Sequence, residues 1–445
     1  MIRREFIGAA AAAVVSAQEK RPNILFLFPD QLRYDWVEPA AIPVRTPHVK
    51  ALAARGIRFS NAFTPSPLCA PCRACLASGR QYGRAGVASN ADNYPLSQPT
   101  FYRALRDSGY HVMGCGKFDL HKPQLDWGLD GKRLIDDWGF SDGIDNEGKH
   151  DGTNAFTRNH RAMGPYLAYL EKRGRAHAHV EDFEKRKKHS AVFPTTLSDE
   201  DYCDNWIGRN GLALIDQAPK EKPWFLQVNF NGPHSPWDIT TSMEKRWRTA
   251  KFPQPNRCEE FTPAEHEAIR QNYAAMVENI DRNVGLYIEK LKQRGELDNT
   301  LIVFSSDHGE MLGDHNMWGK TKPHQGSAAV PLVVAGPGVR ANRVVNDATA
   351  TLDLPATFLD YGGAQQPDGM DSKSLRPHLT RSASARPHVT SALGKWRIVV
   401  QDRYKYVEGY TPAPQLFDLR NDPAENENLA ATKPALAREM KAALS

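Results

Sequence analysis

Ile24-Leu25-Phe26-Leu27-Phe28 is an unbroken apolar run that Pro29 ends, and the polar pair Asp30-Gln31 follows directly. A short apolar run without alternation is typical of a strand buried on both faces, and such strands belong to parallel sheets covered by helices. Proline cannot extend the ladder of hydrogen bonds, so it marks the end of the strand. The run predicts a central strand with polar side chains just beyond its carboxyl end.

Three later segments have the same form. Each is a short apolar run that Gly, Pro or Ser ends and that polar residues follow, and these runs lie at 111–113, 225–230 and 301–304. Helical patterns separate them, the clearest with apolar residues at three- and four-residue steps between 262 and 297. This alternation predicts an α/β fold with a mostly parallel central sheet flanked by helices.

Length and composition set the number of units. A chain of 445 residues with 40% hydrophobic residues predicts two or three globular units. The segment 355–377 is rich in Gly and Pro and suits a linker. We therefore expect a large unit at 21–362 and a smaller C-terminal α+β unit at 363–445, with strands near 396–400 and 405–407.

Charge and cysteine content exclude two classes of protein. The chain has 57 Lys and Arg against 52 Asp and Glu, and the net charge of +5 is spread along it, which excludes a dedicated nucleic-acid binder. Six cysteines are too few for a disulfide scaffold in a chain of this length. Four of them lie between 69 and 115, which indicates a chemical use.

The N-terminus has the pattern of an export signal. Arg3-Arg4-Glu5-Phe6-Ile7 precedes an apolar stretch at 8–15, and Val15-Ser16-Ala17 follows. The pattern resembles a twin-arginine signal at 1–17, cut after Ala17. A buried helix is the alternative, but the alanine run has no polar face. The apolar stretch is shorter than the roughly 20 residues that span a bilayer. We expect a periplasmic or extracellular protein that does not span the membrane.

Cys69-Ala70-Pro71-Cys72-Arg73-Ala74-Cys75 has three possible interpretations. As CxxCxxC it would begin a set of iron–sulfur ligands, but Gly79 occupies the position of the next ligand. As an isolated residue, Cys69 would be a small buried hydrophobe. As Cys69-x-Pro71-x-Arg73, with Ser78-Gly79-Arg80 downstream, it is a CxPxR motif.

The CxPxR motif resembles the signature of the type I sulfatases, which belong to the alkaline phosphatase superfamily. The resemblance implies an alkaline-phosphatase-like fold and a maturation enzyme that oxidises Cys69 to formylglycine. The hydrated aldehyde attacks sulfur with one hydroxyl, and the second hydroxyl then expels sulfate. If 70–78 form a helix, residue 69 lies at its N-terminus, where backbone N–H groups favour negative charge, and Arg73 lies one turn along.

Asp30-Gln31 and Asp307-His308 each follow a predicted strand. The resemblance implies that both pairs bind one divalent metal. Their oxygens suit Ca2+, the ion we expect, or Mg2+, and His308 leaves Mn2+ and Zn2+ open. The carboxylates could instead cap neighbouring helices. Gln31 stands where the family commonly has a second aspartate, a departure towards the phosphonate monoester hydrolase branch.

The resemblance also implies the remaining catalytic residues. Lys117 contacts the nucleophile and the sulfate, a protonated His234 donates to the leaving oxygen, and Lys320 binds the sulfate. A base must also remove a proton from the hydrate. Asp119 stands where the family usually has histidine, and His121 follows two residues later, so either could be this base.

We therefore expect an exported sulfatase that hydrolyses a carbohydrate or aryl sulfate, with a small molecule or a glycan as its substrate. Phosphonate or phosphate monoesters are the alternative substrates on the same scaffold. A protein of another class, a non-catalytic binder of sulfated glycans, would use the basic residues at 185–188.

Overall fold

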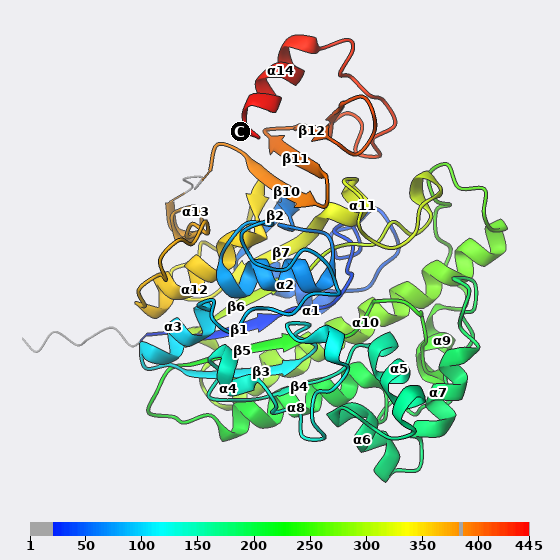
Figure 1. The fold of residues 1–445 in the computed structure, drawn as a ribbon, viewed down its shortest axis with the longest axis vertical. Helices are drawn as coiled ribbons and strands as arrows, with labels where there is room; N and C mark the ends of the chain where they lie inside the picture. The colour runs from blue at the N-terminus through cyan, green and yellow to red at the C-terminus, as the bar shows by residue number, and fades with distance from the viewer. Residues whose placement is uncertain (1–20, 382–385, 445) are drawn as a thin grey trace, which may run out of the picture.

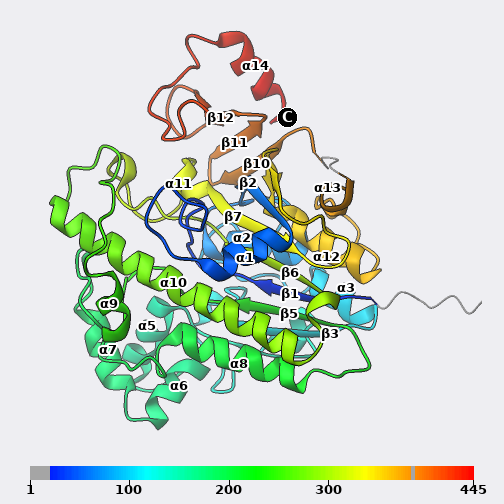
Figure 2. The same ribbon diagram turned by 180° about the vertical axis from the view of Figure 1, so that it is seen from behind.

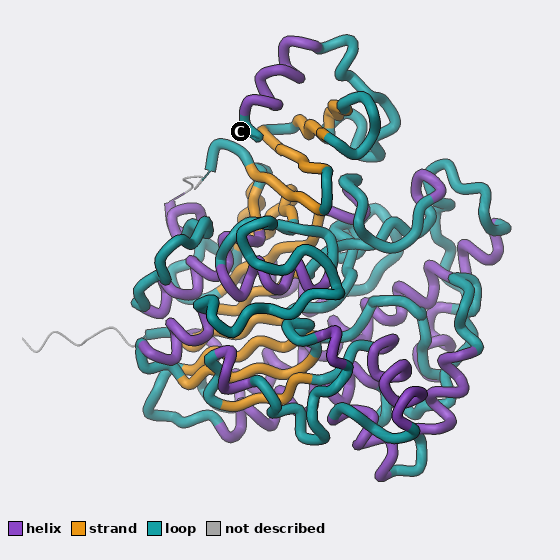
Figure 3. The backbone as a smooth tube through the Cα atoms, in the orientation of Figure 1, coloured by secondary structure: helices purple, strands orange, loops and turns teal. Residues whose placement is uncertain are grey.

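The computed structural model describes residues 21–381 and 386–444, and the signal expected at 1–17 lies outside them. A nine-stranded sheet forms the centre of the described molecule, in the order β4-β3-β5-β1-β6-β7-β2-β8, with β9 paired to β2 (Figure 1; Figure 3). Its strands are β1 (Asn23–Leu27), β2 (Ile57–Phe63), β3 (His111–Gly116), β4 (Asp142–Asp145), β5 (Trp224–Asn229), β6 (Thr300–Ser305), β7 (Ala329–Ala335), β8 (Arg343–Val345) and β9 (Thr349–Ala350).

The sheet is mostly parallel, as the sequence predicted. β1 pairs in parallel with β5 and β6, and β3 pairs in parallel with β4 and β5. β2 pairs in parallel with β8 and β9, whereas β7 runs antiparallel to both β2 and β6. The four apolar runs are β1, β3, β5 and β6, so the predicted strands and fold class are confirmed.

Helices cover both faces of the sheet. Both faces are apolar, because alternate side chains of each buried strand point to opposite sides. Phe26 and Phe28 belong to the core under α2 (Cys69–Ser78), α3 (Phe101–Asp107) and α12 (Leu354–Gly362), the face seen in Figure 1. Leu25 and Leu27 belong to the core under α1 (Pro47–Arg55), α8 (Cys203–Gln217) and α10 (Pro263–Gln293), the face seen in Figure 2.

The longest helix, α10, begins within one residue of its predicted start. Thr262 and Glu265 form a capping box in which each side chain accepts a hydrogen bond from the backbone of the other residue. The other helices of the large unit are α4 (Ile135–Trp138), α5 (Lys149–Asn159), α6 (Pro165–Lys172), α7 (Ala176–Glu184), α9 (Thr241–Trp247) and α11 (Gln325–Ala328).

A second, antiparallel sheet lies near the C-terminus, at the top of Figure 1. It consists of β10 (Val389–Leu393), β11 (Trp396–Gln401), β12 (Tyr404–Glu408) and β13 (Gln415–Asp418), with α13 (Arg376–Arg381) before it and α14 (Pro434–Ala442) packed on it. The linker prediction for 355–377 is wrong in its first part, because Phe358 and Leu359 on α12 are buried against the central sheet.

The order of the strands positions the site. β3, β5, β1 and β6 are consecutive neighbours, so their carboxyl ends share one edge of the sheet. Ligands of open parallel sheets bind at this edge. Among the described helices, none has both the length and the apolar character needed to cross a membrane.

Candidate active site

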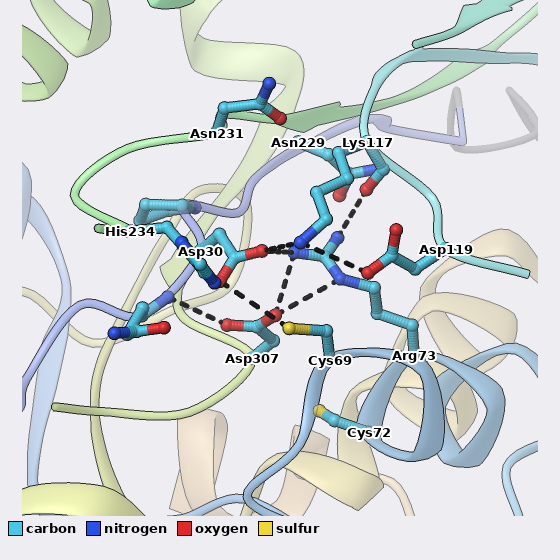
Figure 4. Close-up of polar contacts among 12 residues, drawn as sticks. Asp30, Cys69, Cys72, Arg73, Lys117, Asp119, Asn229, Asn231, His234 and Asp307 are labelled. Carbon is cyan, nitrogen blue, oxygen red and sulfur yellow. Dashed lines mark hydrogen bonds and ion pairs between the residues drawn. The ribbon is translucent and has the colours of Figure 1, made fainter. Parts of the chain in front are cut away.

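Cys69 is the first residue of α2 and lies within a buried group of charged side chains (Figure 4). Its Sγ is 3.4 Å from Nε2 of His308 and 3.9 Å from Oδ1 of Asp30. Burial and Asp30 raise the pKa of the thiol, but the positive charges around it, first that of Lys117, outweigh them and hold the pKa well below its usual range. The site therefore favours negative charge at residue 69.

The far end of α2 explains the glycine that stands where an iron–sulfur ligand set would need a cysteine. Gly79 ends the helix in the left-handed conformation, with φ of 64°. A Cβ at this position would collide with the side chain of Met370. The left-handed backbone is therefore the main reason for a glycine at this position.

Three of the predicted metal-binding side chains converge on Cys69. One potential ligand atom from each of Asp30, Cys69, Asp307 and His308 lies within 4.8 Å of the others, and all four residues are buried. Nδ1 of His308 is 3.0 Å from the carbonyl oxygen of Gly309, so Nε2 faces the group. Two carboxylates and an imidazole are a suitable donor set for a divalent cation.

Arg73 links the carboxylates to the neighbouring strand end. Its Nε and Nη2 donate to Oδ2 of Asp307 at 3.2 and 2.9 Å, and Nη2 also lies 3.4 Å from Oδ2 of Asp30. Nη1 donates to the carbonyl oxygen of Lys117 at 2.6 Å. These contacts fix the guanidinium between β1, β3 and β6, one helical turn from Cys69.

Lys117 follows β3 and is 3% exposed. Its ammonium forms ion pairs with Asp30 and, at 3.1 Å, with Asp119. Burial raises the pKa of Asp30, but the charge of Lys117 is the largest opposing effect, and the pKa falls well below its usual value. Lys122 forms ion pairs with Asp119 at 3.0 Å and with Asp151 at 2.6 Å.

The two candidate bases have different surroundings. Asp119 is 2% exposed, and Lys117 and Lys122 lower its pKa against the effect of burial. Its Oδ1 has no partner within the described structure. His121 is half-buried, and burial followed by the charge of Arg133 lowers its pKa. Hydrogen bonds and ion pairs connect Asp119, but not His121, to the other described site residues.

His234 follows β5, and Lys320 lies on the loop between β6 and β7. Nζ of Lys320 is 2.5 Å from Nε2 of His234 and 2.7 Å from Oε1 of Gln31. Nδ1 of His234 contacts the carbonyl oxygen of Ser235. Burial and then the charge of Lys320 lower the pKa of His234 well below its usual value. This direction favours a neutral imidazole beside the Lys320 side chain, and the protonated His234 expected from the sequence stays a prediction.

Gln31 lies beside the metal-binding group, but its amide is engaged elsewhere. Its backbone N–H donates to Oδ1 of Asp307 at 3.0 Å, and its side-chain Nε2 donates to Glu310. Glu310 was not predicted as a site residue, although it stands two residues after the Asp307-His308 pair. Lys122 and Asp151 were not predicted either, because neither spacing nor a strand end gave a signal for them.

The fold and the site together define a hydrolase of the alkaline-phosphatase-like fold. A family model described as Sulfatase matches residues 22–364, and a model described as N-sulphoglucosamine sulphohydrolase, C-terminal, matches residues 313–445. The chain belongs to the sulfatase family.

Individual relatives agree with this assignment. The choline-sulfatase of Rhizobium meliloti (strain 1021) is 29% identical, over 92% of this chain and 82% of its own. The arylsulfatase of Clostridium perfringens (strain 13 / Type A) is 25% identical, over 92% and 90%. The crystal structure of the phosphonate monoester hydrolase of Agrobacterium radiobacter has the same fold, with a TM-score of 0.79 and 24% identity over 95% of both chains. The chain is a sulfuric ester hydrolase, as the sequence predicted.

Proposed function

We propose that the chain hydrolyses a carbohydrate or aryl sulfate ester at residue 69, after a maturation enzyme has converted Cys69 to formylglycine. The observation that carries the proposal is the position of this side chain, at a helix N-terminus and within 3.4 Å of Nε2 of His308. The hydrated aldehyde would supply the nucleophile and the route by which sulfate leaves.

Asp30, Asp307 and His308 would hold one divalent cation beside residue 69, with Ca2+ as the expected ion and Mg2+, Mn2+ and Zn2+ as alternatives. The cation would supply a Lewis acid for a sulfate oxygen. Arg73 pairs with both carboxylates and Lys117 pairs with Asp30. Burial raises the pKa of Asp30, but the positive charges around it, first that of Lys117, outweigh burial and lower this pKa. The chain's own residues therefore supply positively charged partners for both carboxylates at this edge of the sheet.

Arg73, Lys117 and Lys320 would stabilise the sulfate and the charge that develops on it. Fixed cations act most strongly where water is excluded, and Arg73 and Lys117 are both 3% exposed. Lys320 is half-buried, and its Nζ lies 2.5 Å from Nε2 of His234. This pair would donate a proton to the leaving oxygen.

Asp119 is the residue that we propose as proton acceptor for the hydrate. Ion pairs connect it through Lys117 to Asp30, whose Oδ1 is 3.9 Å from Sγ of Cys69, and its own Oδ1 is free of protein partners in the described structure. His121, the other candidate, has no such connection. The predicted export of the chain places this chemistry in the periplasm or outside the cell.

Two observations bear on the substrate. The choline-sulfatase and arylsulfatase relatives favour a small sulfate ester, and the second family model is named for a sulfated sugar. Gln31 and the fold shared with a phosphonate monoester hydrolase favour a phosphorus ester as the second candidate. Rates with an aryl sulfate, an aryl phosphate and an aryl phosphonate monoester test the choice. We expect the highest kcat/KM for the sulfate, and a higher value for the phosphonate would contradict it.

A further inference from the structure

We propose that Glu310 is a positioning residue, which through the side-chain amide of Gln31 fixes the ammonium of Lys320 in the site. The inference deepens the proposed function, because it depends on the assignment of Lys320 to the substrate anion.

Glu310 is buried, and its carboxylate accepts from two backbone N–H groups of the loop that carries Lys320. It is 1% exposed. Oε1 accepts from the backbone N–H groups of Leu312 at 3.1 Å and of Gly319 at 2.5 Å, and Oε2 accepts from Nε2 of Gln31. Gly319 immediately precedes Lys320. One carboxylate therefore fixes the backbone before Lys320 and the amide that its side chain contacts.

The direction of these hydrogen bonds fixes the orientation of the amide. A carboxylate that accepts from Nε2 of Gln31 leaves Oε1 of the same amide on the opposite side. That oxygen accepts from Nζ of Lys320 at 2.7 Å. If the amide were reversed, its N–H groups would face the ammonium, donor against donor.

The backbone of Gln31 is held as firmly as its side chain. Its φ of 69° is in the left-handed region, which residues other than glycine rarely adopt. The N–H donates to Asp307, and the carbonyl oxygen accepts from the hydroxyl of Tyr273 at 2.7 Å. Such a conformation persists only where the surroundings impose it. The contacts of Gln31 thus direct its side chain towards Glu310 and Lys320.

The same contacts leave Lys320 able to bind an anion. An ammonium has three N–H donors. Gln31 and His234 accept two of them, and both acceptors are neutral. The positive charge and one donor remain for the substrate. The proposal therefore assigns Gln31 to Lys320, whereas the sequence analysis assigned it to the metal.

Exchanging the two side chains tests the proposal. Glu310→Gln preserves shape but leaves one acceptor oxygen. When that oxygen keeps the two backbone hydrogen bonds, the amide N–H groups face Gln31 and favour reversal of its amide. Gln31→Glu places two carboxylates face to face. The double variant Gln31→Glu, Glu310→Gln restores a donor opposite an acceptor and returns a carboxylate oxygen to Lys320. The matched control is Glu147→Gln, because Glu147 is equally buried and its carboxylate accepts from the backbone N–H groups of Tyr166 and Leu167.

The readouts are the affinity of the full-length, metal-loaded chain for inorganic sulfate, measured by calorimetry, and its metal content. We expect each single variant to weaken sulfate binding about ten-fold or more, the effect of losing one charge-assisted hydrogen bond. The double variant should bind sulfate better than either single variant but less well than the wild type, because the carboxylate at residue 31 pairs with the Lys320 ammonium, while the metal content stays constant and Glu147→Gln binds like the wild type.

Several results would overturn the proposal. One is an unchanged affinity for sulfate in both single variants. Another is a double variant that binds sulfate no more tightly than the weaker-binding single variant. A third is a loss of metal that parallels the loss of sulfate binding. If a single variant does not fold, recovery by the double variant still decides the question. Sulfate binding that follows the expected pattern in a chain without ester turnover would reject the proposed function and leave this inference intact.

Discussion

Lys117 and Lys320 both belong to the group around Cys69, but their ammonium groups have different neighbours. We call Lys117, Asp119, Lys122 and Asp151 the Lys117 flank, and Lys320, His234, Gln31 and Glu310 the Lys320 flank. On the first, each ammonium pairs with two carboxylates, since Lys117 contacts Asp30 and Asp119 and Lys122 contacts Asp119 and Asp151. On the second, Lys320 contacts an amide oxygen and an imidazole.

This difference separates two uses of a buried positive charge. Paired ions largely cancel each other, so the Lys117 flank stabilises the arrangement of the carboxylates around residue 69. The positive electrostatic potential of an ammonium is not cancelled by neutral partners, so the Lys320 flank attracts an anion. The Lys117 flank therefore combines its part in the reaction with the stability of the site, whereas the Lys320 flank acts on the substrate and contributes little to stability. The following predictions test this division, from the largest expected effect to the smallest.

Residue 69 serves both flanks, and its loss has the largest expected effect. Cys69→Ala removes the nucleophile and should lower kcat/KM by at least about a thousand-fold. The chain should still fold, because only one sulfur atom is lost. Turnover of an aryl sulfate and the free energy of unfolding in urea measure the two effects. Full activity in this variant would contradict the mechanism.

The two lysines should respond differently to truncation. Lys117→Ala leaves Asp30 without its closest cation in a buried site, which should lower the free energy of unfolding by about 3–5 kcal/mol in addition to abolishing turnover. Lys320→Ala should lower kcat/KM by about 100–1000-fold, the usual effect of losing a charge-stabilising group. Its loss of unfolding free energy should stay near 1 kcal/mol, since its partners are neutral. Equal destabilisation by the two variants would remove the distinction between the flanks.

Asp119, the proposed proton acceptor for the hydrate, lies on the Lys117 flank. Asp119→Asn should lower kcat by about 100-fold or more, the usual contribution of a general base, and His121→Ala should change it by less than about three-fold. Single-turnover measurements with an aryl sulfate separate release of the alcohol from release of sulfate. A larger loss of kcat in His121→Ala than in Asp119→Asn would assign the role of proton acceptor to His121.

The sequence predicted the strand-end residues of the site but not the loop that completes it. Asp30, Lys117, His234 and Asp307 each follow an apolar run, and parallel pairing brings the ends of such runs together. Glu310 acts through residues distant in the sequence, because it contacts Gln31 across the sheet edge and Gly319 across its own loop. The spacing of apolar residues along the sequence gives no information about contacts of that kind.

The linker prediction at α12 was wrong for a similar reason, because it was based on composition alone. The Gly and Pro residues after 354 suggested a linker, but burial of Phe358 and Leu359 against the sheet outweighs local propensity. The protonation of His234 also depends on tertiary structure, because Lys320 approaches it from another loop. The residue types of the site were therefore predictable, whereas their mutual hydrogen bonds were not.

The smallest expected effect is on acid stability. The folded-state pKa of Asp119 is lowered, so its stabilising contribution is present above the unfolded pKa of about 4 and is lost as the pH falls below that value. Asp119→Asn should therefore destabilise the chain more at pH 7 than in acid. Urea unfolding of both proteins across this range measures the difference, and a constant difference at every pH would reject the assigned ion pairs.

The central claim is that residue 69 becomes an aldehyde beside a metal-binding group at the edge of the sheet. Mass spectrometry of the tryptic peptide that contains residue 69, prepared from enzyme with full sulfatase activity, tests it most directly. The account predicts formylglycine or its hydrate at this position. An intact Cys69 thiol in fully active enzyme would contradict it.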